Sequence, residues 1–290
     1  MSLLVDRFVA AAGVESHSCP AESEIVSCVK ALRRRVGLKS VAPSRLDPFL
    51  KARNIHDVAT DSNLQGDGAL VPLGTNFRAG FRMLLKRDIP EGRINFTVAH
   101  EICHTFFYER VPEIKFADHP VDPEEERLCN CGAEELLMPA FDVKRRARGE
   151  PVCLAALQKL ASHYRVTLAA MLIRLRKLAL WKAELVLWHE MTNGTFAVKE
   201  VWGGRMTDWR WLDNGIPRGA LSTNPSRTLS GHTCWFIDTP SGWKLRPVSY
   251  QIGRHKGDVI ALVIRHRTKR QVQNTGSSQP ELFSRAPKRA

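Results

Sequence analysis

The chain has 290 residues, of which 43% are hydrophobic, so it is long enough to build one large domain or two of ordinary size. This excludes a wholly disordered chain and a small peptide held together by disulfides. Lys and Arg total 43 against 30 Asp and Glu, which gives a net charge of +13. The basic stretches could form a solvated face, or they could attract an acidic partner such as nucleic acid or an acidic protein.

The expected location is the cytoplasm. No apolar run reaches the roughly 18–20 residues that a membrane-spanning helix needs. The first residues do not read as a secretory signal, because Asp6 and Arg7 interrupt them. The seven cysteines are odd in number and scattered, which fits reduced thiols better than disulfides. We therefore expect a soluble cytoplasmic protein.

Helical patterns dominate before residue 180, beginning with residues 24–37 (EIVSCVKALRRRVG). The most informative segment is residues 93–109, RINFTVAHEICHTFFYE. Here Ile94, Val98, Ile102 and Phe106 recur at fourfold spacing, and neither Gly nor Pro interrupts the segment. The pattern predicts a helix.

This predicted helix carries His100, Glu101 and His104 in the pattern H-E-x-x-H. Residues i and i+4 project about 40° apart on a helix, so both imidazoles can bind one tetrahedral zinc. A zinc-bound water has a lowered pKa, and Glu101 beside it could take the proton as the water attacks a carbonyl. Without further ligands, the two histidines could also be hydrogen-bonded residues of a core.

A second helix is predicted downstream, in DHPVDPEEERLCNCGAEELLMP. Asp122 can cap its first turn, Pro123 suits the first helical position, and Glu125 occupies the capping-box position. Pro139 ends it.

The second helix supplies the third ligand. Glu126 and Asn130 lie one turn apart on a face that is otherwise apolar, where a carboxylate needs a partner such as zinc. We predict that Glu126 completes the ligand set of His100 and His104, and that Asn130 orients a ligand histidine. Helix geometry alone does not exclude Glu125 as the ligand, but capping is its expected role.

Residues 154–178 have the spacing of two short helices joined near Arg165, where Thr167 could cap the second helix. Two interpretations are open. The basic residues could contact nucleic-acid phosphates, or the segment could pack as a bundle through Leu168, Met171, Leu172 and Leu175. The possible phosphate contacts are Arg165, Arg174, Arg176 and Lys177.

The composition changes after residue 180, because all seven tryptophans lie between residues 181 and 243. Residues 185–190 and 195–202 read as two strands joined by a tight turn at Asn193-Gly194. Residues 232–238, 243–252 and 258–267 are further strand candidates. The tail from about residue 269 is polar and basic and is expected to be disordered.

The text from Arg93 to Pro139, with N-F-T-V-A-H-E-x-x-H-x-F followed by E-x-x-C-N-x-x-A-x-E-L-L-M-P, resembles the ImmA/IrrE family of bacterial and phage metallopeptidases. The similarity covers roughly residues 75–140. It implies that His100, His104 and Glu126 bind zinc and that Glu101 is catalytic. Family members typically cleave a helix-turn-helix repressor, which relieves repression of a mobile element or a stress response. In some relatives a GAF-like sensor occupies the position of the Trp-rich part.

Two departures from the family pattern stand out. Cys103 replaces the frequent Gly before the second His, and the Phe-Ala pair is changed to Gly132 with Cys131 beside it. A thiolate at Cys103 could compete for zinc or sense an oxidant, although a buried inert thiol is the commoner outcome.

Together these patterns predict an α+β protein with a helical zincin-like peptidase core and a small sheet. The expected parts are a metallopeptidase domain at 1–140, a basic helix-turn-helix-like segment at 141–180, a Trp-rich β-rich domain at 181–268 and a disordered basic tail at 269–290. The predicted function is a zinc metallopeptidase that cleaves a helix-turn-helix repressor. The alternative is a DNA-binding regulator with a structural or vestigial zinc site. Candidates for the oxyanion-stabilising residue are Tyr108, His119 and His163.

Overall fold

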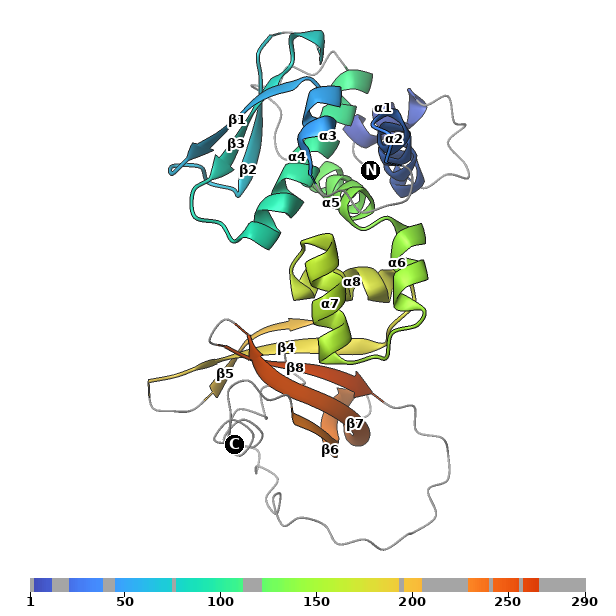
Figure 1. Ribbon diagram of the computed structural model, residues 1–290, viewed down its shortest axis with the longest axis vertical. Helices are drawn as coiled ribbons and strands as arrows, with labels where there is room; N and C mark the ends of the chain where they lie inside the picture. Colours follow the sequence, from blue (N-terminus) through green and yellow to red (C-terminus); the bar gives the residue numbers. More distant parts are fainter. Residues whose placement is uncertain are drawn as a thin grey trace, which may run out of the picture. The chain divides into compact units, whose positions relative to one another are not determined.

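A computed structural model describes residues 3–11, 21–38, 45–74, 77–111, 122–192, 196–204, 229–239, 242–255 and 258–265 (Figure 1). The chain divides into two compact units. Unit 1 comprises Met1–Glu150 with Gln158–Arg174, and unit 2 comprises Pro151–Leu157 with Leu175–Ala290. Helices and two separate sheets confirm the predicted α+β class. Among the described residues, no helix has the length and apolarity to cross a bilayer.

The elements before unit 2's sheet are mostly helical, as predicted. They are α1 (Leu3–Ala10), α2 (Ala21–Arg35), α3 (Asp47–Ala52), β1 (Ile55–Asp61), β2 (Gly68–Pro72), the 3₁₀ helix η1 (Phe77–Ala79), β3 (Phe81–Lys86), α4 (Glu91–Arg110), α5 (Pro123–Leu137), α6 (Ala140–Ala147), α7 (Leu154–Tyr164) and α8 (Leu168–Lys177).

Unit 1 contains a three-stranded sheet in the order β1-β3-β2, in which β3 runs parallel to β1 and antiparallel to β2. Along β3, Phe81, Met83 and Leu85 are buried and alternate with more exposed residues, which is the period of a strand with one covered face. Helix α4 covers the sheet, and α1, α2 and α5 lie on the other side of α4 (Figure 1).

Helix α4 packs through the residues that its fourfold pattern indicated, since Val98, Ile102 and Phe106 are all buried. A buried arginine fixes this helix to the start of the sheet. Arg53 lies between the rings of Phe77 and Phe106 and donates hydrogen bonds to the hydroxyl (2.7 Å) and carbonyl (2.9 Å) of Thr105. A buried guanidinium needs such partners, because its desolvation is otherwise unfavourable.

Helix α5 begins and ends as its sequence predicts. The Asp122 carboxylate accepts a hydrogen bond from the backbone N–H of Glu124 at 2.9 Å, and the helix ends before Met138. Two buried arginines from distant segments hold the last turn. Arg33 donates to the Leu136 carbonyl at 2.6 Å, and Arg174 donates to the Met138 carbonyl at 3.0 Å. These cations complement the negative end of the helix dipole.

The turn between α7 and α8 lies where it was expected. Thr167 caps α8, because its hydroxyl accepts a hydrogen bond from the Ala170 N–H at 3.1 Å. Leu168, Met171, Leu172 and Leu175 are buried, as the packing interpretation of this segment required.

Unit 2 contains a five-stranded antiparallel sheet in the order β5-β4-β8-β7-β6. Its strands are β4 (Ala183–Glu190), β5 (Phe196–Trp202), β6 (Leu229–Thr239), β7 (Gly242–His255) and β8 (Asp258–Arg265). Strands β4 and β5 pair as predicted, although the Asn193-Gly194 turn lies outside the described residues, as does the tail from 269. The core includes Val186, Trp188, Ile252 and Val263. The GAF-like expectation for this part stays a prediction.

Candidate metal centre

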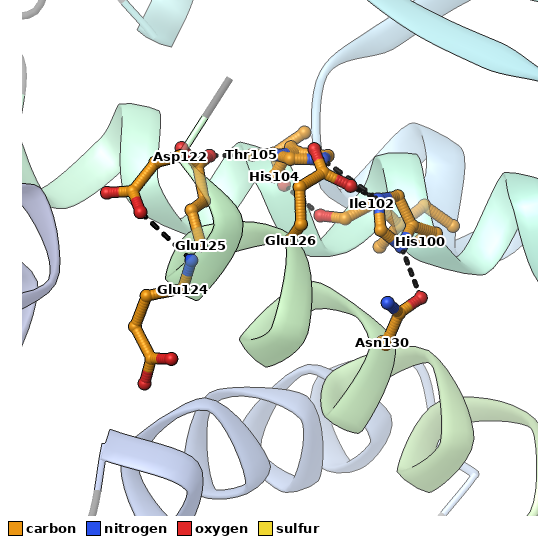
Figure 2. A network of polar contacts seen from close by, with 9 residues as sticks. All are labelled: His100, Ile102, His104, Thr105, Asp122, Glu124, Glu125, Glu126 and Asn130. Atoms are coloured by element: carbon orange, nitrogen blue, oxygen red, sulfur yellow. Dashed lines mark hydrogen bonds and ion pairs between the residues drawn. The ribbon is translucent and has the colours of Figure 1, made fainter. Parts of the chain in front are cut away.

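Helices α4 and α5 bring three predicted ligands together (Figure 2). The Nε2 atoms of His100 and His104 lie 3.0 Å apart. The Glu126 carboxylate is 3.1 Å from His100 Nε2 and 3.4 Å from His104 Nε2. The two imidazoles therefore offer one nitrogen each, and Glu126 offers a carboxylate oxygen, to a common point, as the sequence spacing indicated.

The opposite ring nitrogens are each held by an oxygen acceptor. His100 Nδ1 lies 3.0 Å from the amide oxygen of Asn130, and His104 Nδ1 lies 2.7 Å from a carboxylate oxygen of Glu125 (Figure 2). An Nδ1–H that donates to such an acceptor leaves the lone pair on Nε2. Both lone pairs then face the same point. Asn130 thus lies behind His100, on the side of the ring away from His104 and Glu126.

This geometry fits a metal cation. Ligand atoms at about 2.0–2.1 Å from one tetrahedral zinc lie about 3.3 Å apart, close to the 3.0, 3.1 and 3.4 Å separations found here. Two nitrogen lone pairs this close repel each other unless a cation lies between them. The Glu126 side chain is 40% exposed, so the point is also reachable from solvent.

The charges around the rings favour a cation as well. Burial by itself would lower the pKa of His104, but its contacts with Cys129, Glu125 and Glu126 raise the pKa well above the ordinary value. Hydrogen bonds from His100 and His104 hold the pKa of the Glu126 carboxyl well below its usual range. The surroundings therefore stabilise positive charge on the His104 imidazole and negative charge on Glu126.

Glu101 is a buried carboxyl next to this cluster. It is 6% exposed, and desolvation raises its pKa, whereas the neighbouring imidazoles of His104 and His100 oppose the rise. Its position depends on a glycine in edge strand β2. A Cβ on Gly68 would lie 2.5 Å from Thr97 Cγ2 and 2.9 Å from Glu101 Oε1, so only glycine leaves Glu101 its present place.

The two cysteines nearest the histidines differ in their surroundings. Cys103 is fully buried and its sulfur points at Gly132, where an added Cβ would lie 2.6 Å away. Burial raises the pKa of the Cys103 thiol well above its ordinary value. Cys129 is the thiol that groups with His104 and Glu125, their possible ligand atoms all lying within 4.8 Å of one another. The thiol beside the histidines is thus Cys129, not Cys103, which sequence reasoning had singled out.

The three candidates for the oxyanion-stabilising residue lie in different surroundings. Tyr108 stacks on Phe81 with ring centroids 5.4 Å apart; desolvation raises its pKa, and His104 lies close enough to oppose this effect. His163 instead packs edge-on against Tyr164, and its Nε2 lies 3.9 Å from the Asp142 carboxylate. His119 lies outside the described residues.

The four predicted phosphate contacts differ in their exposure and in their hydrogen-bond partners. Arg174 is 7% exposed and pairs with the buried Glu135, so its burial argues against contact with a phosphate. Arg176 donates to the Ala183 carbonyl at 2.6 Å. Arg165 and Lys177 are exposed.

Sequence reasoning missed two features of the site. It assigned Glu125 to capping, whereas the Glu125 carboxylate is buried against His104 Nδ1. It also passed over Cys129. The spacing of Glu125 and Cys129, one helical turn apart, places both side chains on one face of α5. A helical wheel of α5 alone does not show that this face is turned toward His104 on α4.

Two histidines one helical turn apart and a glutamate from the following helix form the ligand arrangement of H-E-x-x-H metallopeptidases. Residues 65–176 match the family model of the IrrE N-terminal-like domain, Peptidase_M78. For this part of the chain, the match confirms the resemblance to the ImmA/IrrE metallopeptidase family seen in the sequence.

A solved structure described as a Mycobacterium tuberculosis transcriptional regulator is 12% identical, with a TM-score of 0.44, and the similarity covers 90% of this chain and 79% of that chain. No curated protein matches the chain.

Proposed function

We propose that this chain is a zinc-dependent peptidase with His100, His104 and Glu126 as metal ligands. The observation that carries the proposal is the convergence of both Nε2 atoms and the Glu126 carboxylate within 3.0–3.4 Å, with both Nδ1 atoms held by acceptors. A closed structural zinc site normally has four protein ligands and more cysteine. An open position next to Glu126 suits catalysis better.

Glu101 is the proposed general base. Zinc bound at this site would lower the pKa of a bound water and polarise the scissile carbonyl. The Glu101 carboxylate would take the proton of the attacking water and pass it to the leaving amine. Its burial raises its pKa, which makes it a stronger base than an exposed glutamate. Thr97 and Gly68 confine its side chain and so limit the positions that the carboxylate can adopt.

Asn130 and Glu125 are proposed to position the ligands. By accepting hydrogen bonds from Nδ1 of His100 and His104, they fix the ring orientation and keep both Nε2 lone pairs directed at one point. Tyr108 is the candidate that would donate a hydrogen bond to the developing oxyanion, because its phenol lies within electrostatic reach of His104.

The proposed substrate is an intracellular helix-turn-helix repressor, cleaved to release a mobile element or a stress response. The match of residues 65–176 to the IrrE N-terminal-like family model supports this substrate class. Exposed Arg165 and Lys177, in a chain of net charge +13, support an additional contact with DNA that would bring the enzyme to a DNA-bound repressor. A shift assay on DNA should then show affinity that falls as salt rises.

The test uses the purified chain, zinc and a purified helix-turn-helix repressor. Glu101→Gln should keep stoichiometric zinc by elemental analysis and lose cleavage, because the amide cannot take the proton. His104→Ala should lose both zinc and cleavage. Glu200→Gln, an exposed glutamate of unit 2, is the matched control and should cleave normally. Cleavage by Glu101→Gln, or stoichiometric zinc in His104→Ala, would refute the assignment.

A further inference from the structure

His104 has a polar group on each side of its ring. Its Nε2 faces His100 and Glu126, as described above. Its Nδ1 faces a second group made by Glu125 and Cys129, in which the Glu125 oxygen lies 2.7 Å away and all three possible ligand atoms lie within 4.8 Å of one another. The same imidazole therefore belongs to two sets of possible metal ligands.

The second set differs from the first in chemistry and in exposure. It offers a nitrogen, a carboxylate oxygen and a sulfur, whereas the first set has no sulfur. Glu125 is 4% exposed and Cys129 is fully buried, whereas the Glu126 side chain is 40% exposed. Thiolate donors favour thiophilic ions such as Zn²⁺ and Cd²⁺ over Mg²⁺ or Ca²⁺. A buried site of this composition suits tight binding more than catalysis, which needs an open position.

The local fold explains why two sets arise. Glu125 and Glu126 are consecutive on α5, so their side chains diverge by about 100° around the helix axis. Glu126 points to the Nε2 side and Glu125 to the Nδ1 side of the same ring (Figure 2). Cys129 follows Glu125 by one turn and lies on the same face of α5.

We propose that His104 Nδ1, Glu125 and Cys129 form a second, buried metal site that takes thiophilic cations and that removes His104 from the first site when it is filled. On binding, the Cys129 thiol proton passes to solvent and the His104 proton moves from Nδ1 to Nε2. The protonated Nε2 no longer offers a lone pair to the first site. Simultaneous binding at both nitrogens would require an imidazolate, which is less favourable.

This inference goes beyond the proposed peptidase function and does not need that function to be correct. The two sites share only His104, so each can be removed separately. His100→Ala removes a ligand of the first set and leaves the second set complete. Cys129→Ser removes the sulfur of the second set and leaves the first set complete.

The experiment titrates Cd²⁺ into the metal-free full-length chain and records bound cadmium together with the ultraviolet sulfur-to-cadmium charge-transfer absorption. The wild type should show a charge-transfer component that Cys129→Ser lacks and that His100→Ala keeps. Glu125→Gln should lower the Cd²⁺ affinity of this site by roughly tenfold or more, because a ligand is lost, so the charge-transfer component should appear only at higher Cd²⁺ concentration. Cys153→Ser, outside the cluster, is the matched control and should leave the component unchanged.

Two results would overturn the inference. One is an unchanged charge-transfer component in Cys129→Ser, because the sulfur would then come from elsewhere. The other is loss of the component in His100→Ala, because Cys129 would then belong to the first set. Circular dichroism establishes that each variant is folded. If Cys129→Ser unfolds, Cys129→Ala is used in its place, because it also lacks the sulfur. If cleavage is observed, Cd²⁺ should inhibit the wild type more strongly than Cys129→Ser.

Discussion

Replacing Gly132 with alanine tests how tightly α4 and α5 are packed next to the candidate metal centre. The added Cβ would lie 2.6 Å from the sulfur of Cys103 and 3.1 Å from Ile25 Cγ1. Both neighbours are fully buried. The sulfur therefore has little free space to move into, and either the helices separate slightly or the cysteine leaves its preferred rotamer.

The expected loss follows from two opposing effects. Forcing an extra methyl into a packed core typically costs about 1–3 kcal/mol, and contacts on two sides put this position in the upper part of that range. Alanine is favoured over glycine inside a helix by about 1 kcal/mol. Gly132→Ala should thus destabilise unit 1 by about 1–2 kcal/mol. When Cys103→Ala has removed the sulfur, the same change should be neutral or stabilise unit 1 by up to about 1 kcal/mol, which gives a coupling of about 1–3 kcal/mol between the two positions.

The two units can be followed separately in one urea titration. All seven tryptophans lie between residues 181 and 243, in unit 2, so tryptophan fluorescence reports on that unit. Far-ultraviolet circular dichroism follows the helices, which lie mainly in unit 1. Gly132→Ala should lower the midpoint of the helical transition and leave the fluorescence transition in place. Gly149→Ala is the control, since its added Cβ meets nothing within 4 Å.

An unchanged or higher helical midpoint in Gly132→Ala would refute this account of the packing. So would the same destabilisation with and without the Cys103 sulfur, because the loss would then have a cause other than the contact described here.

Three further predictions concern the site and its support. Gly68→Ala should lower peptidase activity by roughly a hundredfold with zinc content retained, because it displaces the general base, whereas Gly66→Ala meets only an ordinary contact and should remain active. Asn130→Ala should weaken zinc affinity by about 10–100-fold in a chelator competition, since His100 loses its orienting acceptor. Arg174→Ala should destabilise unit 1 by about 3–5 kcal/mol in the urea titration by leaving the buried Glu135 unpaired, whereas Lys177→Ala should change stability by less than about 0.5 kcal/mol.

The sequence could predict the features that depend on one helix at a time. The H-E-x-x-H pattern placed His100 and His104 on one face of α4, and the spacing on α5 placed Glu126 with Asn130. These residues do converge. The same reasoning located Thr167 as a cap, because capping is set by a few neighbouring residues.

Features that depend on how two helices are rotated against each other were not predictable. The helical wheel of α4 placed Cys103 near the histidines, but its sulfur turns toward Gly132, and Cys129 from α5 takes that place instead. Arg174 was interpreted as a possible phosphate contact, and no pattern in the sequence singled out Arg53. Their burial depends on partners many residues away, Thr105 and Glu135, that a linear pattern does not connect.

The arginines at the end of α5 also determine how the chain can be shortened. Arg174 bonds to the Met138 carbonyl and pairs with Glu135, and Tyr164 donates to the Asp142 carboxylate at 3.0 Å. A fragment cut at residue 140 would keep every proposed zinc ligand and Arg33, but the buried Glu135 and the Met138 carbonyl would lose their contacts with Arg174. The smallest fragment that keeps these contacts for crystallisation or activity assays must therefore extend past residue 174.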